Sequence, residues 1–182
     1  MVPNATTNNL RSIYFKYKEL IRFSLSFFLA ILFSIVFNDI LSLRNWLADS
    51  ELTALLLNIT GNTTLFFLEI FRFEYFVEGI KIKLENTNGV LIVFGCLAYR
   101  HIILFIAFIL FYSGKFHHKL WYIFLGTISL IIINSFRIFI IAISQIQFSA
   151  YTEEIHFYFT RLIMYGTLFL FWFIWIKRVQ YK

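Results

Sequence analysis

Residues 120–143 have the sequence LWYIFLGTISLIIINSFRIFIIAI, and this stretch decides the fold class of the chain. The stretch is apolar almost throughout, and Arg137 is its one charged residue. A bilayer core about 30 Å thick requires about 20 consecutive apolar residues of α-helix. We therefore predict that residues 120–143 cross a membrane as a helix.

Three further apolar blocks, at about residues 20–37, 92–112 and 156–176, extend this pattern along the chain. The chain is 60% hydrophobic and 14% charged, with a mean hydropathy of +0.76, whereas a soluble domain has about 25% charged residues. The blocks do not alternate apolar with polar residues, which excludes the strands of a membrane β-barrel. The first block is long and is followed by no small-residue cleavage site, so we interpret it as a retained span. We predict an all-α polytopic membrane protein, a single membrane domain over residues 1–182 with about four transmembrane helices.

The segment from about residue 38 to 91 is the longest part of the chain outside these blocks. Leu41 to Ile59 mixes apolar and polar residues, as an amphipathic helix lying in the membrane interface does. Gly79 to Glu85 alternates with the period of a strand, and Asn88-Gly89 is a strong turn signal. Two interpretations remain open for Val77 to Phe94, a small β-hairpin or an irregular loop.

The charges at the ends of the apolar blocks predict the orientation. One side of the membrane holds the amino-terminal tail, the loop at residues 113–119 and the carboxyl-terminal tail, and these segments sum to +8. The whole chain has a net charge of +6, so the rest of the chain must sum to −2. The residues that give +8 are Arg11, Lys16, Lys18, Arg22, Lys115, Lys119, Lys177, Arg178 and Lys182, against Glu19. Basic loops stay in the cytoplasm. We expect a multi-pass protein of the cell inner (cytoplasmic) membrane with both termini cytoplasmic and residues 38–91 extracytoplasmic, and no nucleic-acid partner.

With this orientation, three chemically active residues lie at the same depth. Cys96 begins the second span on its outer side, Arg137 is near the outer end of the third, and His156 opens the fourth. Taken singly, each has a simpler explanation: a small hydrophobe, a side chain reaching the headgroups, an interfacial residue. Together they supply a thiol nucleophile, a fixed cation and an acid–base group. Charged groups in spans usually face the bundle interior and mark functional sites.

Neighbouring residues add to this set. Arg100 follows Cys96 by four residues, which on a continuous helix places it on the same face, about 6 Å along the axis. Asn134 precedes Arg137 by three residues and is predicted to orient it. His101 lies over a hundred degrees around the helix from Cys96 and is a poorer partner.

Other polar residues offer less. Glu153 and Glu154 either hold the His156 ring or are solvated loop acids. His117 and His118 lie on the cytoplasmic side. One cysteine and four scattered histidines give no zinc-ligand spacing, and we expect no metal and no cofactor.

The motifs resemble the exosortase/archaeosortase family of membrane transpeptidases. The resemblance covers roughly residues 75–175 and rests on Gly95-Cys96, on Asn134-Ser-Phe-Arg137-Ile and on His156, each at the outer edge of a successive span. The chain is similar to the smaller members, with fewer spans. It departs from the family after the cysteine, where Leu97-Ala98 replaces the usual small turn such as Ser-Gly or Asn-Gly.

The resemblance implies a cysteine-dependent transpeptidase or protease that processes carboxyl-terminal sorting signals on the extracytoplasmic side. Its catalytic residues would be Cys96, Arg137 and His156, supported by Arg100 and Asn134. Its partners would be secreted proteins ending in a motif, a transmembrane helix and a basic tail, together with the lipid bilayer and an envelope acceptor molecule.

Two other functions remain open. The first is a non-enzymatic membrane subunit that scaffolds a secretion or polysaccharide-export complex. The second, ranked last, is a transporter or channel component in which Arg100 and Arg137 bind an anion, because such sites use helices broken near the midplane and the spans contain few glycines. A rhomboid-type serine protease is disfavoured, since the chain has no Gly-x-Ser-x-Gly motif.

Overall fold

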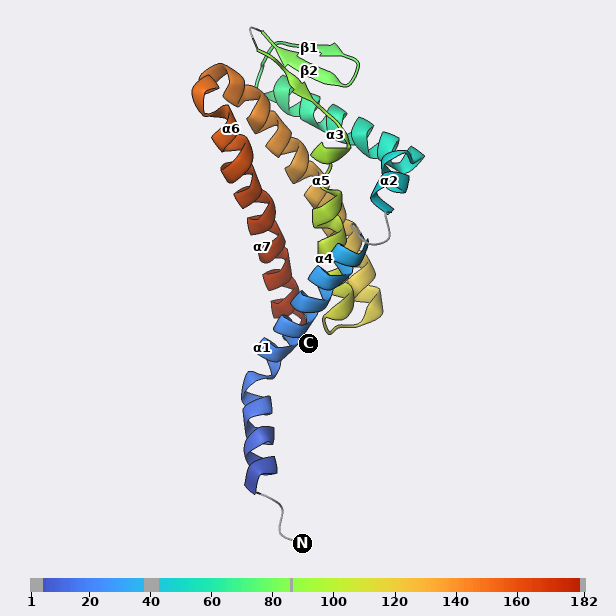
Figure 1. Ribbon diagram of the computed structural model, residues 1–182, viewed down its shortest axis with the longest axis vertical. Helices are drawn as coiled ribbons and strands as arrows, with labels where there is room; N and C mark the ends of the chain where they lie inside the picture. Colours follow the sequence, from blue (N-terminus) through green and yellow to red (C-terminus); the bar gives the residue numbers. More distant parts are fainter. Residues whose placement is uncertain (1–4, 38–42, 86, 181–182) are drawn as a thin grey trace.

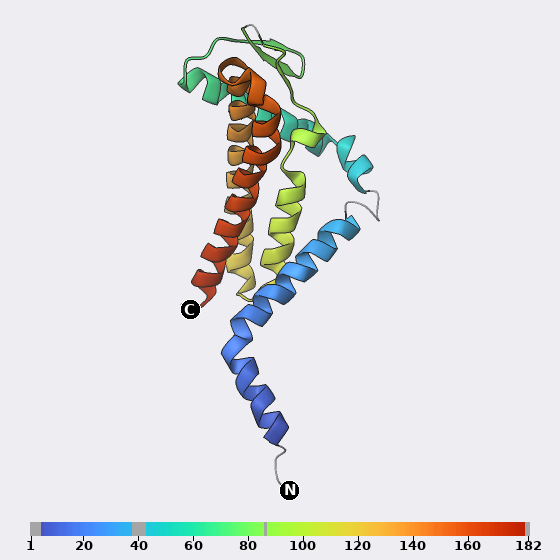
Figure 2. The ribbon, with the colours of Figure 1, turned by 60° about the vertical axis from the view of Figure 1, so that its left-hand side comes forward.

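Four helices form a bundle in which the shortest helix is central. The computed structural model describes residues 5–37, 43–85 and 87–180. The bundle helices are α1 (Ala5–Ile35), α4 (Tyr99–Phe111), α5 (Phe116–Gln147) and α7 (Thr160–Gln180). Helix α4 contacts all three of the others, and the arrangement is visible in Figures 1 and 2. The segments that precede and follow α4 in the chain therefore lie next to the centre of the bundle.

The lengths and hydropathies of the helices confirm a mostly helical membrane protein. Within the described ranges, three helical stretches are long and apolar enough to cross a membrane, Glu51–Ile70, Phe116–Gln147 and Ser149–Val179, while α4 is a shorter apolar helix. Helix α4 has 13 residues and is about 20 Å long, less than the bilayer core of about 30 Å. The second span stays a prediction over residues 92–112, and the helix within it begins only at Tyr99.

Aromatic packing holds the bundle together. Phe108 of α4 stacks on Trp172 of α7 with ring centroids 4.5 Å apart, and Phe23 of α1 meets Phe108 edge-on at 5.7 Å. Phe105 and Trp172 are almost completely buried. Aromatic pairs at these distances contribute about 0.5–1.5 kcal/mol each beyond the area they bury. The phenylalanine-rich sequence thus supplies much of the contact between spans.

A close approach of α4 and α5 depends on one glycine. A Cβ atom on Gly126 would lie 2.3 Å from the ring of Phe105, which is itself fully buried. Atoms cannot approach so closely, so any side chain at residue 126 would push the two helices apart or displace the ring. Gly126 therefore sets the separation of α4 and α5.

Two helices occupy the region in which a single interfacial helix was predicted. Helix α2 (Leu43–Ala48) and helix α3 (Glu51–Ile70) are separated at Ser50, which caps α3 by accepting a hydrogen bond from the backbone N–H of Thr53. Helix α3 lies across one end of the bundle in both ribbon views (Figures 1 and 2). The predicted helix of Leu41–Ile59 was therefore wrong in its end and in being continuous, and its first two residues, 41–42, lie outside the described ranges.

A three-stranded antiparallel sheet covers the same end of the bundle, which we call the sheet end (Figure 1). Its strands, in spatial order, are β1 (Tyr75–Glu78), β2 (Lys81–Leu84) and β3 (Val90–Leu91). The predicted strand region is confirmed, but as a meander with an additional strand. The tightest turn lies at Gly79, whose φ is 61°, rather than at Asn88-Gly89, which belongs to the longer β2–β3 loop.

A second apolar core attaches the sheet to the helices. It contains Leu68 of α3, Ile82 and Leu84 of β2, and Phe139 of α5, and Cys96 packs against it while partly buried. The alternation of β2 explains this, since every second residue faces inward. The side chain of Gln145 on α5 adds a polar connection. Its Oε1 accepts a hydrogen bond from the backbone N–H of Gly89 at 3.0 Å. The β2–β3 loop, just before β3, is thereby held against the end of α5.

Candidate active site

Cys96 lies in a short non-helical connection between the sheet and α4. Residues Phe94–Cys96 form one 3₁₀ turn, with the backbone N–H of Cys96 donating to Val93 at 2.7 Å. Leu97 is extended, with φ −73° and ψ 145°. The Cys96 Sγ is 3.4 Å from the carbonyl oxygen of Leu91, to which the thiol donates. The thiol is thus held at the sheet end, next to the start of the central helix.

Asn134 connects α5 to this turn. Its side chain is 1% exposed, and its Nδ2 donates to the backbone carbonyl oxygen of Cys96 at 2.9 Å. Its Oδ1 accepts from Nη1 of Arg137, one helical turn later, at a longer 3.4 Å. One buried amide therefore touches both the backbone of the thiol residue and the predicted cation.

Arg137 is at the centre of the charged groups at the sheet end. Its guanidinium interacts electrostatically with Cys96 and Arg161, with His101 and with His156. Its Nε is buried and has no hydrogen-bond partner among the described residues. A buried donor without a partner costs about 1–3 kcal/mol, and such groups often belong to ligand sites.

His156 lies in a π-helical turn, Ile155–Phe159, that precedes α7. Its backbone carbonyl accepts from the hydroxyl of Thr160. The His156 side chain is exposed and borders a hollow of about 580 Å³ together with Glu153 and Glu154. Single π-helical turns inside α-helices frequently occur at functional sites. Among the described residues, the His156 ring donates no hydrogen bond to either glutamate.

The structure thus places the three predicted residues at one end of the bundle, on three separate elements. Cys96 and His156 both lie within the electrostatic range of Arg137. No direct hydrogen bond joins the three side chains within the part of the chain that the structure describes. Arg137 is the group whose charge acts on both of the others.

Arg100 does not have the relationship to Cys96 that a continuous helix predicted. Helix α4 starts at Tyr99 and Leu97 is extended, so helical spacing from Cys96 has no meaning there. The Arg100 side chain is exposed, and its Nε donates to the hydroxyl of Tyr99 at 3.0 Å. The proposed helical alignment of Arg100 with the thiol was therefore wrong.

The same helical argument predicted that His101 is a poor partner for Cys96. In the structure, His101 lies closer to Arg137 than that argument implied. Its ring lies 5.0 Å from the ring of Tyr165 on α7, and its Nδ1 is buried without a partner in the described residues. It interacts with both Arg137 and Arg100. Its position in the first turn of α4 turns it toward α7, which sequence spacing alone did not reveal.

Arg161 was not singled out from the sequence, although a cation inside an apolar span is a general signal. Its guanidinium lies 3.8 Å from the ring centroid of Phe157, and it interacts with Arg137 and His156. The sheet end thus gathers arginines from α5 and α7. In the described ranges, no three His, Cys, Asp or Glu side chains come close enough to hold a metal ion.

His117 and His118 lie next to one another in the first turn of α5, with ring centroids 6.1 Å apart. That turn is at the end of the bundle opposite the sheet. The structure therefore separates this pair from the residues around Arg137.

The fold and this cluster define a class, a multi-pass helical membrane protein with a thiol, cations and imidazoles gathered at one end of its helical bundle. A family model described as transmembrane exosortase matches residues 13–176. The chain belongs to the transmembrane exosortase family, whose members are membrane transpeptidases that process PEP-CTERM sorting signals. No curated protein and no solved structure matches the chain.

Proposed function

We propose that the protein is a cysteine-dependent transpeptidase or peptidase that cleaves carboxyl-terminal sorting signals of secreted proteins. The observation that carries this proposal is the position of Arg137. Its guanidinium donates to Asn134, whose amide donates to the backbone carbonyl of Cys96. Its charge is also near enough to act on Cys96 and His156, which come from separate parts of the chain. Membership of the exosortase family supports the same reaction class.

The proposed first step forms an acyl-enzyme. His156 takes the thiol proton of Cys96, and the sulfur attacks the carbonyl carbon of the scissile peptide bond. The carbonyl oxygen becomes negatively charged, and Arg137 stabilises that charge. The carbon–nitrogen bond then breaks, His156 returns the proton to the leaving amine, and a thioester to Cys96 remains.

The second step releases the product. An amine or another nucleophile of an envelope acceptor, or water, attacks the thioester, and its proton passes through His156 to the departing sulfur. Transfer to an acceptor makes the reaction a transpeptidation, and transfer to water makes it a hydrolysis. Either route regenerates the thiol of Cys96.

Asn134 is proposed as a positioning residue. Its hydrogen bond to the carbonyl of Cys96 and its contact with Arg137 fix the thiol residue relative to the cation. Arg100 has a weaker case, because its side chain is exposed and its Nε donates to the hydroxyl of Tyr99.

We further propose that the sheet end faces the extracytoplasmic side of the cytoplasmic membrane. The supporting observation is the basic character of the opposite end, where α4 connects to α5 and α7 ends. Lys115, Lys119, Lys177 and Arg178 lie there, as the positive-inside rule requires of a cytoplasmic face. Sorting signals of secreted proteins would then meet Cys96 after export.

The decisive test is a reporter protein that carries a PEP-CTERM sorting signal, co-expressed with the full chain in membranes. Cleavage should occur with the natural chain and stop with Cys96→Ser, which keeps size but supplies a far weaker nucleophile at neutral pH. Mass spectrometry should find the reporter's new carboxyl terminus attached to Cys96 when acceptors are removed. If the protein is instead a scaffold subunit, Cys96→Ser should have no effect on cleavage of the reporter. Full cleavage by Cys96→Ser at matched expression would therefore contradict the enzyme proposal.

A further inference from the structure

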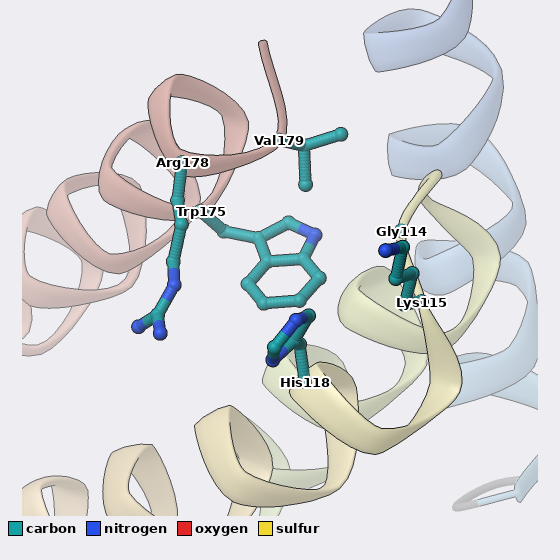
Figure 3. A pocket seen from close by; sticks show the side chains of 6 residues that line it. All are labelled: Gly114, Lys115, His118, Trp175, Arg178 and Val179. Carbon is teal, nitrogen blue, oxygen red and sulfur yellow. The ribbon is translucent and has the colours of Figure 1, made fainter. Parts of the chain in front are cut away.

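A small basic pocket at the end of the bundle opposite the sheet lies far from the thiol cluster. It has a volume of about 160 Å³ and lies between the α4–α5 connection and the end of α7. Its lining residues are Gly114, Lys115, His118, Trp175, Arg178 and Val179, shown in Figure 3. Two of these lining residues, Lys115 and Arg178, carry a fixed positive charge.

Trp175 contributes a buried hydrogen-bond donor at the pocket. Its side chain is 1% exposed, and its indole Nε1 is buried without a hydrogen-bond partner among the described residues. Figure 3 shows this nitrogen on the edge of the ring that is turned toward Gly114 and Val179. A buried indole N–H normally has an acceptor, so this pocket presents a donor to whatever occupies it.

Gly114 makes the pocket possible. Its φ is 141°, and a Cβ atom there would lie 2.7 Å from the Trp175 ring. The residue thus needs both the conformation and the small size of glycine. Lys115 follows as the N-cap of α5 and provides no side-chain cap, which leaves the positive end of that helix dipole beside the pocket.

The surroundings contain one described acid, Glu19 of α1, and it is already engaged. Its carboxylate accepts from the hydroxyl of Tyr112 at 3.0 Å and forms an ion pair with Arg22 at 3.2 Å. The pocket residues Lys115 and Arg178 form no ion pair with it in the described part of the chain. The net charge around the pocket is therefore positive, which favours binding of an anion.

We propose that this pocket binds a phosphate group, that of an anionic phospholipid headgroup at this membrane face. Lys115 and Arg178 supply the charge, the Trp175 indole donates a hydrogen bond, and His118 borders the site. Basic pockets between transmembrane helices recognise such headgroups, and Trp is enriched at this depth of the membrane. A free phosphate ion has the same chemistry, so the test separates the two sources. This inference is independent of the peptidase reaction.

The test is native mass spectrometry of the purified full chain in a neutral detergent, titrated with phosphatidylglycerol, phosphatidylcholine or inorganic phosphate. Phosphatidylglycerol should bind more tightly than phosphatidylcholine, whose headgroup has no net charge. Arg178→Gln should weaken phosphatidylglycerol binding about fivefold, as loss of one cation near an anionic lipid does. Lys177→Gln is the matched control, since Lys177 lies outside the pocket and contacts the Phe173 ring at 5.3 Å.

A second variant distinguishes loss of lipid binding from loss of folding. Trp175→Phe keeps an aromatic ring but removes the N–H donor, and it should weaken phosphatidylglycerol binding while the gel-filtration profile is unchanged. Competition by inorganic phosphate that Arg178→Gln abolishes would support a phosphate site filled from solution. Equal binding of the two lipids, or equal losses in Arg178→Gln and Lys177→Gln, would overturn the proposal.

Discussion

The side-chain amide of Asn134 donates to the backbone carbonyl oxygen of Cys96 across 2.9 Å, joining residues 38 positions apart. This bond connects the long helix α5 to the 3₁₀ turn that carries Cys96. The same amide contacts Arg137. The thiol residue and the buried cation are therefore positioned by a single side chain.

Replacing Asn134 by Leu should impair both structure and activity. The carbonyl of Cys96 loses its donor, and an unsatisfied buried polar group costs about 1–3 kcal/mol. We expect sorting-signal cleavage to fall sharply and alkylation of Cys96 by a maleimide to become faster, because the turn is loosened. Ser129→Ala is the control, since that hydroxyl bonds only within its own helix at the exposed surface. Unchanged alkylation and cleavage in Asn134→Leu would show that the bond has no positioning role.

Arg137 and Arg100 should differ strongly in mutational effect. Arg137→Lys keeps the charge but loses the planar guanidinium, and removing one oxyanion-stabilising group costs about 100- to 1000-fold in rate. Arg100→Ala should have a much smaller effect, because Arg100 is exposed and pairs with Tyr99. Cleavage rates at matched expression measure both. Equal effects of the two variants would contradict the assignment of Arg137 as the site cation.

The two histidines near Arg137 provide a second comparison. His156→Ala should lower cleavage by about 100-fold or more, the contribution of a general acid–base group. His101→Phe should retain most of the activity, since it keeps an aromatic ring beside Tyr165. If His101→Phe abolishes cleavage and His156→Ala does not, the acid–base role belongs to His101.

Gly126→Ala should destabilise the bundle, because the added Cβ would lie 2.3 Å from the Phe105 ring. Overpacking of a buried site costs about 1–3 kcal/mol. Gly166→Ala is the matched control in another span, where a Cβ meets no atom within 4 Å. Thermal unfolding in detergent should show a lower midpoint for Gly126→Ala alone. Identical midpoints for the two variants would argue against the close approach of α4 and α5.

The orientation can be measured independently of activity. Reporter fusions at Gly114 should report the cytoplasm, and fusions in the β2–β3 loop at Asn88 should report the opposite side, because the basic residues gather near Gly114. Modification of Cys96 by a membrane-impermeant thiol reagent in intact cells gives the same information. A cytoplasmic signal at Asn88 would reverse the proposed topology and place Cys96 away from exported substrates.

The sequence by itself predicted the membrane class, the helical bundle and the strand region. Long apolar blocks require helices in a bilayer, because each backbone polar group must find a partner within its own segment. The alternation around Ile82 and Leu84 likewise predicted a strand with one buried face. The grouping of Cys96, Arg137 and His156 at one depth followed from counting spans.

Only the tertiary structure decided where helix α4 begins and which neighbours reach the cation. Residues 92–98 are apolar enough to continue a helix, but β3, the second core and the Asn134 bond hold them in another conformation. Because this connection is not α-helical, Arg100 is exposed and His101 lies near Arg137. These contacts come from residues distant in sequence, and local spacing carries no information about them.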